Sequence, residues 1–167
     1  MGRLFGTDGI RGIANRALSI QRSAQVGQAL ATVLRERLGE GRKPRVFIGK
    51  DTRLSSDMIE AALAAGLCAG GVDCVALGVV PTPAVAYLTV AHGMDAGVMI
   101  SASHNPFQFN GIKIFGPKGY KLTDREEAEI EDMILDDAIP MHKAEAGEIG
   151  RYSQGTGLAE EYIRHIA

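Results

Sequence analysis

The feature that most constrains the fold is a regular alternation of helix-like and strand-like segments along the chain. The segments follow one another as a helix at 19–39, a strand at 46–48, a helix at 56–70, a strand at 72–77, a short helix at 84–91 and a strand at 96–100. Strands separated by helices are typical of layered α/β proteins. We therefore expect an α/β fold: a three-layer domain with a mostly parallel mixed sheet of about four strands flanked by helices.

Two further segments follow the last of these strands. The short apolar run from Gly111 to Phe115 precedes the turn 116–119, which predicts an edge strand or a hairpin arm. Thr123 and Glu126 have the spacing of a capping box, and the helix that they begin is expected to end near Leu135. We interpret the acidic residues of this helix as a solvated face without a function.

Composition narrows the class of protein. The chain has 167 residues and a formal net charge of −2, with 18 Lys and Arg residues that form no basic stripe. This argues against nucleic acid as the main partner. We see no apolar run long enough to span a membrane and no secretory leader, so we expect a cytoplasmic protein without a membrane partner. Cys68 and Cys74 lack metal-ligand spacing and are expected to be small buried residues in a reducing compartment.

The loop Ser101-Ala102-Ser103-His104-Asn105-Pro106 lies between two apolar runs, where a strand is expected to end. Small neighbours leave the Ser103 hydroxyl accessible, while His104 and Asn105 add hydrogen-bonding groups. The plainer interpretation is a turn whose polar groups bind the local backbone. The alternative is a nucleophilic serine at the carboxyl end of a strand, where α/β proteins place their ligands.

Several motifs resemble those of the alpha-D-phosphohexomutase family. They are Phe5-Gly6-Thr7-Asp8-Gly9-Ile10-Arg11-Gly12, Gly49-Lys50-Asp51-Thr52-Arg53, the serine loop itself and Asn110-Gly111-Ile112-Lys113. Members of that family have four domains, and this chain resembles the first. The resemblance implies that residues 1–150 form the phosphoserine domain and that residues 151–167 form an exit linker leading to a second domain.

The resemblance also assigns roles to individual residues. It implies that Ser103 is a phosphoserine that gives its phosphoryl group to a sugar phosphate, forms a bisphosphorylated intermediate and takes a phosphoryl group back. It also implies that Lys113 handles the proton of the reacting hydroxyl and that Arg11 supports the phosphoryl charge. His104 could assist proton transfer, bind the phosphoryl group or hold the loop in shape. The further candidates for binding substrate or phosphate are Ser101, Asn105, Lys50 and Arg53.

The expected cofactor is Mg²⁺. Ser103, through its phosphoryl oxygens, would be this chain's metal ligand, and the carboxylate ligands would come from another domain. A bisphosphate, glucosamine 1,6-bisphosphate, is the implied intermediate and activator. The remaining domains of the same enzyme and the sugar phosphate are the implied partners, and the sequence leaves a homodimer open.

The motifs constrain the identity of the sugar substrate less than they constrain the type of reaction. The form of the first motif and of the serine loop favours interconversion of glucosamine 6-phosphate and glucosamine 1-phosphate, a step toward amino-sugar nucleotides of the cell wall. Phosphoglucose or phosphomannose as substrate, and a non-catalytic sugar-phosphate-binding domain, are the alternatives. A serine hydrolase would also use Ser103 with a histidine, but the chain has no G-x-S-x-G elbow.

Overall fold

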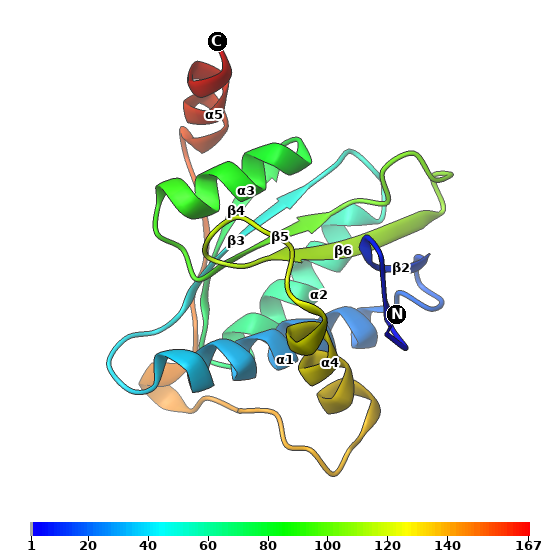
Figure 1. Cartoon of the computed structure of the whole chain (residues 1–167), viewed down its shortest axis with the longest axis vertical. Coiled ribbons are helices and arrows are strands. Elements are labelled where there is room, and N and C mark those ends of the chain that lie inside the picture. Colours follow the sequence, from blue (N-terminus) through cyan, green and yellow to red (C-terminus); the bar gives the residue numbers. More distant parts are fainter. Residues whose placement is uncertain (1) are drawn as a thin grey trace.

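The computed structural model describes residues 2–167 as a three-layer α/β domain (Figure 1). One mixed sheet has seven strands in the order β1-β2-β6-β5-β3-β4-β7. The strands are β1 (Phe5–Gly6), β2 (Gly9–Ile13), β3 (Arg45–Lys50), β4 (Asp73–Val79), β5 (Ala96–Ile100), β6 (Phe109–Phe115) and β7 (Tyr152–Gln154). The α-helices are α1 (Ile20–Leu38), α2 (Ser56–Ala69), α3 (Thr82–Ala91), α4 (Asp124–Leu135) and α5 (Leu158–Ile166), and a 3₁₀ turn lies at Ala146–Glu148.

The α/β class and the three layers are confirmed, but the sheet is larger than expected and half of its pairings are antiparallel. Strands β3, β4, β5 and β7 pair in parallel, whereas β5 with β6, β6 with β2 and β2 with β1 are antiparallel. The loop from 101 to 108 that joins β5 to β6 is too short for the crossover that parallel strands need, so β6 returns antiparallel. The N-terminal motif then adds β1 and β2 as a hairpin.

Strand β6 is therefore an interior strand and a hairpin arm, which corrects the alternative that placed it at an edge. It pairs with β5 on one side and with β2 on the other. The side chain of Ile112 faces one core and is fully buried. The polar residues of the N-terminal motif gave no alternation that would predict a strand, and only pairing with β6 makes β2 part of the sheet.

Both faces of the sheet are covered. Helices α1, α2 and α4 bury one face, with Val46, Ile48, Val98 and Ile112 in that core. Helix α3 covers the other face over Phe47, Met99 and Phe115. Figure 1 shows α3 and α5 on the side of the sheet opposite α1 and α4. Because α3 crosses only part of its face, polar side chains near β2 and β6 stay accessible there.

Local contacts cap the ends of α1 and the start of α4. The Ser19 hydroxyl accepts a hydrogen bond from the backbone N–H of Arg22 at 3.0 Å, and Gly39 ends α1 with a left-handed φ of 64°. Thr123 and Glu126 form the predicted reciprocal capping box of α4. These signals depend on residues that lie within one helical turn of each other.

The acidic run of α4 is not simply a solvated face, which corrects our interpretation. Glu127 and Glu131 are buried, and Glu127 forms an ion pair with Lys121. The Glu131 carboxylate accepts hydrogen bonds from the backbone N–H groups of Arg3, Leu4 and Phe5 at 3.0, 2.9 and 2.7 Å. Helix α4 thereby anchors the start of the N-terminal hairpin.

The C-terminal segment also contacts the domain. Strand β7 pairs in parallel with β4, and in α5 the ring of His165 stacks on Tyr87 of α3 with centroids 3.9 Å apart. The boundary at residue 150 stays a prediction.

In residues 2–167, no helix has the length and apolar character needed to cross a membrane. Cys68 and Cys74 are free thiols with sulfurs 3.7 Å apart, and Cys74 is fully buried.

Candidate active site

Ser103 lies in the loop between β5 and β6 with an unusual backbone conformation. Its φ is 56°, in the left-handed region that side chains other than glycine rarely adopt. Its N–H donates to the Ser101 hydroxyl at 3.0 Å, and the N–H of Asn105 donates to the carbonyl of Ala102 at 3.1 Å. Backbone strain at an exposed serine is a frequent mark of a functional loop. The structure therefore favours a chemical role for this turn.

A cavity of about 240 Å³ opens beside the loop. Its lining residues are Asp8, Arg11, Thr82, Met99, Ser101, Ser103, His104 and Lys113. Five of these lining residues are candidates from the sequence analysis, and those five come from three segments of the chain. Asp8, Thr82 and Met99 were not expected to belong to the site.

Strand register explains why Arg11 and Lys113 share this cavity. Arg11 lies opposite Gly111, and Lys113 lies opposite Met99. Because alternate residues of a strand point to the same face, these side chains emerge on the face that α3 leaves partly open. A Cβ atom at Gly111 would come within 2.7 Å of the Ser101 carbonyl oxygen. Glycine at this position therefore permits the close approach of β6 to the loop.

The cavity is rich in positive charge. The Asp8 carboxylate lies 3.8 Å from Lys113 Nζ and 3.8 Å from Arg11 Nη2. Arg11 Nε is buried and has no hydrogen-bond partner in the part of the chain that the structure describes. A free donor on one of two neighbouring cations is suited to an anionic group such as a phosphoryl group.

His104 lies next to Ser103. Its Nδ1 is 3.2 Å from the Ser103 hydroxyl oxygen, close enough for one hydrogen bond. The contact is compatible with proton transfer and with holding the hydroxyl in one orientation. The geometry leaves both roles open.

Thr82 is the first residue of α3, and sequence reasoning placed it in a plain loop after β4. The N-terminus of α3 borders the cavity through this residue. Backbone N–H groups at a helix N-terminus attract anions. Its place after the carboxyl end of a parallel strand was the signal that could have identified it.

Three candidate phosphate ligands do not line this cavity. Lys50 Nζ instead forms ion pairs with Asp57 at 2.8 Å and with Glu60 at 3.4 Å, and Glu60 is buried. Asn105 lies in the same loop beyond the cavity wall, and Arg53 binds the loop from beneath. Arg53 and Lys50 thus have protein partners for their charges.

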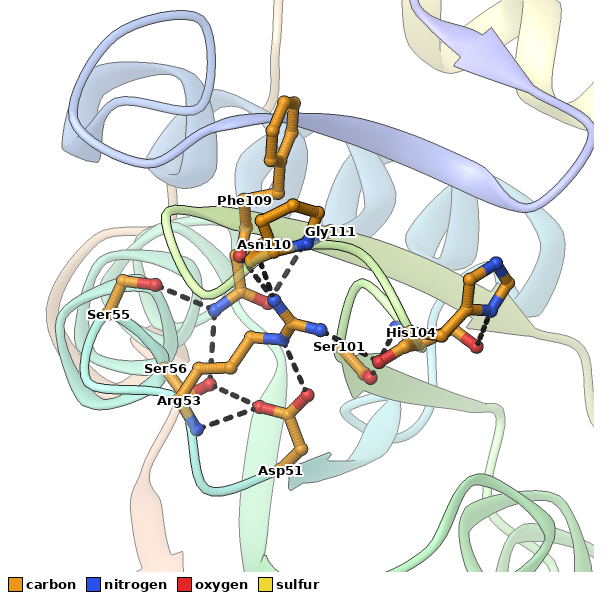
Figure 2. Close-up of polar contacts among 11 residues, drawn as sticks. Asp51, Arg53, Ser55, Ser56, Ser101, His104, Phe109, Asn110 and Gly111 are labelled. Atoms are coloured by element: carbon orange, nitrogen blue, oxygen red, sulfur yellow. Dashed lines mark hydrogen bonds and ion pairs between the residues drawn. The ribbon is translucent and has the colours of Figure 1, made fainter.

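Figure 2 shows the polar contacts beneath the loop, where Asp51 and Arg53 face each other. Burial by itself would raise the pKa of Asp51, but hydrogen bonds from the Arg53 backbone and from the Ser101 and Ser56 hydroxyls hold this pKa below its ordinary value. Asp51 is therefore a carboxylate at neutral pH. Its charge balances the Arg53 guanidinium.

Among residues 2–167, no group of three or more His, Cys, Asp or Glu side chains could hold a metal ion. The side chains of this chain therefore do not fit a self-contained Mg²⁺ site.

Fold and site together define a domain built to present a serine hydroxyl beside cations. A family model described as phosphoglucomutase/phosphomannomutase, alpha/beta/alpha domain I, matches residues 2–139. The chain therefore belongs to the phosphoglucomutase/phosphomannomutase family and contains its first domain.

Curated relatives with similar sequences support the same family. The phosphoglucosamine mutase of Desulforamulus reducens is 49% identical over 163 residues, which are 98% of this chain and 36% of the relative. The phosphoglucosamine mutase of Mycobacterium ulcerans is 51% identical over 167 residues, or 100% of this chain and 37% of the relative. The chain thus spans little more than a third of the length of the curated relatives that it matches.

Solved structures share the fold. A phosphoglucomutase/phosphomannomutase family protein from Burkholderia thailandensis superposes with a TM-score of 0.79 at 27% identity, over 98% of this chain and 35% of that one. Parafusin, a phosphoglucomutase from Paramecium, has a TM-score of 0.75 at 16% identity, over 99% and 34% of the two chains. The second likeness shows the fold alone.

Proposed function

We propose that this chain is the phosphoserine domain of a mutase that interconverts glucosamine 6-phosphate and glucosamine 1-phosphate. The observation that carries the proposal is the shared cavity of Ser103, Arg11 and Lys113. The relatives of about half-identical sequence carry the name phosphoglucosamine mutase, which supports the choice of the amino sugar. Phosphoglucose and phosphomannose are the alternative substrates.

In the proposed reaction, Ser103 is both donor and acceptor. A hydroxyl of the sugar phosphate attacks the phosphorus on phosphorylated Ser103, a new P–O bond forms to the sugar, and the bond from phosphorus to Ser103 Oγ breaks. The proton of the attacking hydroxyl goes to Lys113, which must be a neutral amine to accept it. The bisphosphorylated sugar then turns around, Ser103 Oγ bonds to its other phosphorus, the bond from that phosphorus to the sugar oxygen breaks, and Lys113 returns the proton to this sugar oxygen.

Arg11 and the N-terminus of α3 would support the phosphoryl charge. A phosphoserine carries a charge of about −1.5 to −2, which needs several donors near it. Arg11 Nε is a buried donor without a partner among the described residues, and Arg11 lines the cavity that holds Ser103. His104 and Ser101 would orient the Ser103 side chain and its backbone.

Mg²⁺ would reach this site through the phosphoryl oxygens on Ser103, together with carboxylates from elsewhere in the enzyme. A bound divalent cation would neutralise part of the charge that develops in phosphoryl transfer. The sugar contacts would also come from the rest of the enzyme, because this chain spans about 36% of its relatives. The two free thiols fit a reducing compartment, and we place the protein in the cytoplasm.

Phosphopeptide mapping tests the proposal in the full-length enzyme. We expect phosphate on Ser103 after incubation with glucosamine 1,6-bisphosphate, and loss of both phosphate and mutase activity in Ser103→Ala. Ser153→Ala, a change in the exposed strand β7, is the matched control and should keep both. Phosphate on Ser101 instead of Ser103, or full activity of Ser103→Ala, would refute the assignment.

A serine hydrolase is the second candidate, since the contact of His104 with Ser103 is one that a hydrolase also needs. The same mapping separates the two functions. A hydrolase would carry an acyl adduct on Ser103 after incubation with an activated ester, whereas a mutase would carry phosphate.

A further inference from the structure

The guanidinium of Arg53 binds three backbone carbonyls at once, two in the serine loop and one at the first residue of β6. Its Nη2 donates to the carbonyl oxygen of Ser103 at 2.7 Å, and its Nη1 donates to those of Pro106 at 2.8 Å and Phe109 at 3.0 Å. Figure 2 shows this guanidinium facing Asp51, away from the ring of His104. One side chain thus connects the start, the middle and the end of the loop.

Asp51 holds Arg53 in this orientation. Arg53 Nε donates to Asp51 Oδ2 at 3.0 Å, and the Arg53 backbone N–H donates to Oδ1 of the same carboxylate at 3.1 Å. The Arg53 side chain is only 11% exposed. The charge and the geometry of the guanidinium are therefore determined before any ligand arrives.

A second set of contacts fastens the same turn to α2 and β6. The Ser56 hydroxyl donates to Asp51 at 2.9 Å. The amide of Asn110 donates to the hydroxyls of Ser55 at 2.9 Å and Ser56 at 3.1 Å, and its carbonyl oxygen accepts from the N–H of Gly111 at 2.9 Å. The base of the loop is thereby tied to the first turn of α2 (Figure 2).

The hydrogen-bonding capacity of Arg53 is largely used by these contacts. A guanidinium has five N–H donors, and the bonds to Asp51 and to the three carbonyls occupy four of them. A phosphoryl group at Ser103 would have to displace backbone carbonyls to reach the same donors. These contacts favour a role for Arg53 other than binding the phosphoryl group directly.

We infer that Arg53 is a positioning residue that holds Ser103 in its left-handed backbone conformation and so keeps the hydroxyl in the cavity with Arg11 and Lys113. A serine has a higher free energy in this conformation than in the common backbone conformations. Contacts with other residues must therefore stabilise it. The bond from Arg53 to the carbonyl of Ser103 itself supplies one directly. The effect of Arg53 on catalysis rests on the proposed phosphoryl transfer, whereas its effect on the backbone of Ser103 does not.

Arg53→Lys is the test, because lysine keeps the charge but lacks the planar fork that reaches several carbonyls. Its matched control is Arg45→Lys, since Arg45 donates to the carbonyls of His92 and Gly93 at the opposite end of the sheet. Asp51→Asn is a second variant, which keeps the shape of the side chain and removes the charge that orients Arg53. Each variant is compared with the wild type by thermal unfolding first.

The structural readout is amide hydrogen exchange in this chain. In Arg53→Lys we expect the amides of Ser103, Asn105 and Phe109 to exchange about tenfold faster, while β3 and β5 keep their protection. Arg45→Lys should leave these amides unchanged. Unchanged exchange in both Arg53→Lys and Asp51→Asn would overturn the inference.

The catalytic readout is transfer of phosphate from glucosamine 1,6-bisphosphate to Ser103 in the full-length enzyme. We expect Arg53→Lys to lower kcat and the single-turnover rate about tenfold with little change in KM, because a displaced nucleophile affects the reaction more than binding. A loss of rate no larger than that of Arg45→Lys would overturn the positioning role. A wild type that takes no phosphate would refute the proposed function, and hydrogen exchange would still decide whether Arg53 holds the loop.

Discussion

Asp8 lies between the two cations of the site, with one carboxylate oxygen 3.8 Å from Lys113 Nζ and the other 3.8 Å from Arg11 Nη2. The carboxylate offsets the repulsion between these like charges and keeps them close together. Both contacts are longer than a hydrogen-bonded ion pair. This arrangement leads to different expectations for the two cations.

Lys113→Met should lower kcat of the full-length enzyme by about 100-fold or more, the scale of general acid–base catalysis, with a small change in KM. The reason is that Lys113 acts on the proton of the reacting hydroxyl and not mainly in binding. Steady-state kinetics measure this split. Lys118→Met, in the exposed turn after β6, is the matched control. Unchanged kinetics in Lys113→Met would reduce Lys113 to a surface lysine.

Arg11→Ala should slow phosphorylation of Ser103 by about 100-fold, as loss of a stabilising donor does in other enzymes. Arg11 lines the cavity and has a buried Nε without a partner among residues 2–167. Mass spectrometry of the Ser103 peptide over time gives the rate, with the exposed Arg16→Ala as control. Equal rates in the two variants would remove Arg11 from the phosphoryl site.

Glu131→Gln should destabilise the chain at neutral pH by about 1–3 kcal/mol, because the backbone N–H groups in β1 and just before it lose a charged acceptor. Burial by itself would raise the pKa of Glu131, but the backbone N–H groups of Phe5, Leu4 and Arg3 hold it below its ordinary value. As the pH falls, the unfolded state therefore binds a proton at this carboxylate before the folded state does. The stabilisation by the Glu131 carboxylate is lost as the pH falls below about 4.3, the ordinary pKa of Glu, toward the lower pKa in the folded state.

Denaturant unfolding of wild type and Glu131→Gln at pH 7 and at low pH tests this expectation. The difference between the two proteins should shrink in acid. Asp132→Asn, which changes an exposed partner of Arg3, is the control and should cost less than about 1 kcal/mol. A difference that does not depend on pH would contradict the role of the ionised carboxylate.

The isolated chain should fold cooperatively but should not turn over sugar phosphates. Two buried clusters and capped helices provide a core, while the sugar contacts and the metal carboxylates are expected from the rest of the enzyme. Circular dichroism during heating and a coupled assay with glucosamine 6-phosphate, Mg²⁺ and the bisphosphate measure the two parts. Mutase turnover by the chain alone would show that its own residues complete the site.

The local features of the chain could be predicted because their causes lie within a few residues. The Ser19 cap, the capping box of Thr123 and Glu126, and strand β5 depend on hydrogen bonds and apolar periodicity at short range. The serine loop with Lys113 was also identified, since its motifs are continuous in the sequence. Asp8, although part of a quoted motif, was missed as a site residue because nothing local links it to Lys113.

The sequence by itself thus determined the alternating helices and strands, many of their ends, and the motifs that place the chain in its family. Only the tertiary structure decided that β6 lies inside the sheet, that Glu131 is buried against the N-terminus, and that Arg53 turns toward backbone carbonyls while Lys50 pairs with acids. The physical reason is distance along the chain. Glu131 and Phe5 are 126 positions apart and Arg53 and Ser103 are 50 apart, so no short-range pattern encodes these contacts, whereas the pairing of Lys50 with nearby acids depends on how β3 packs against α2.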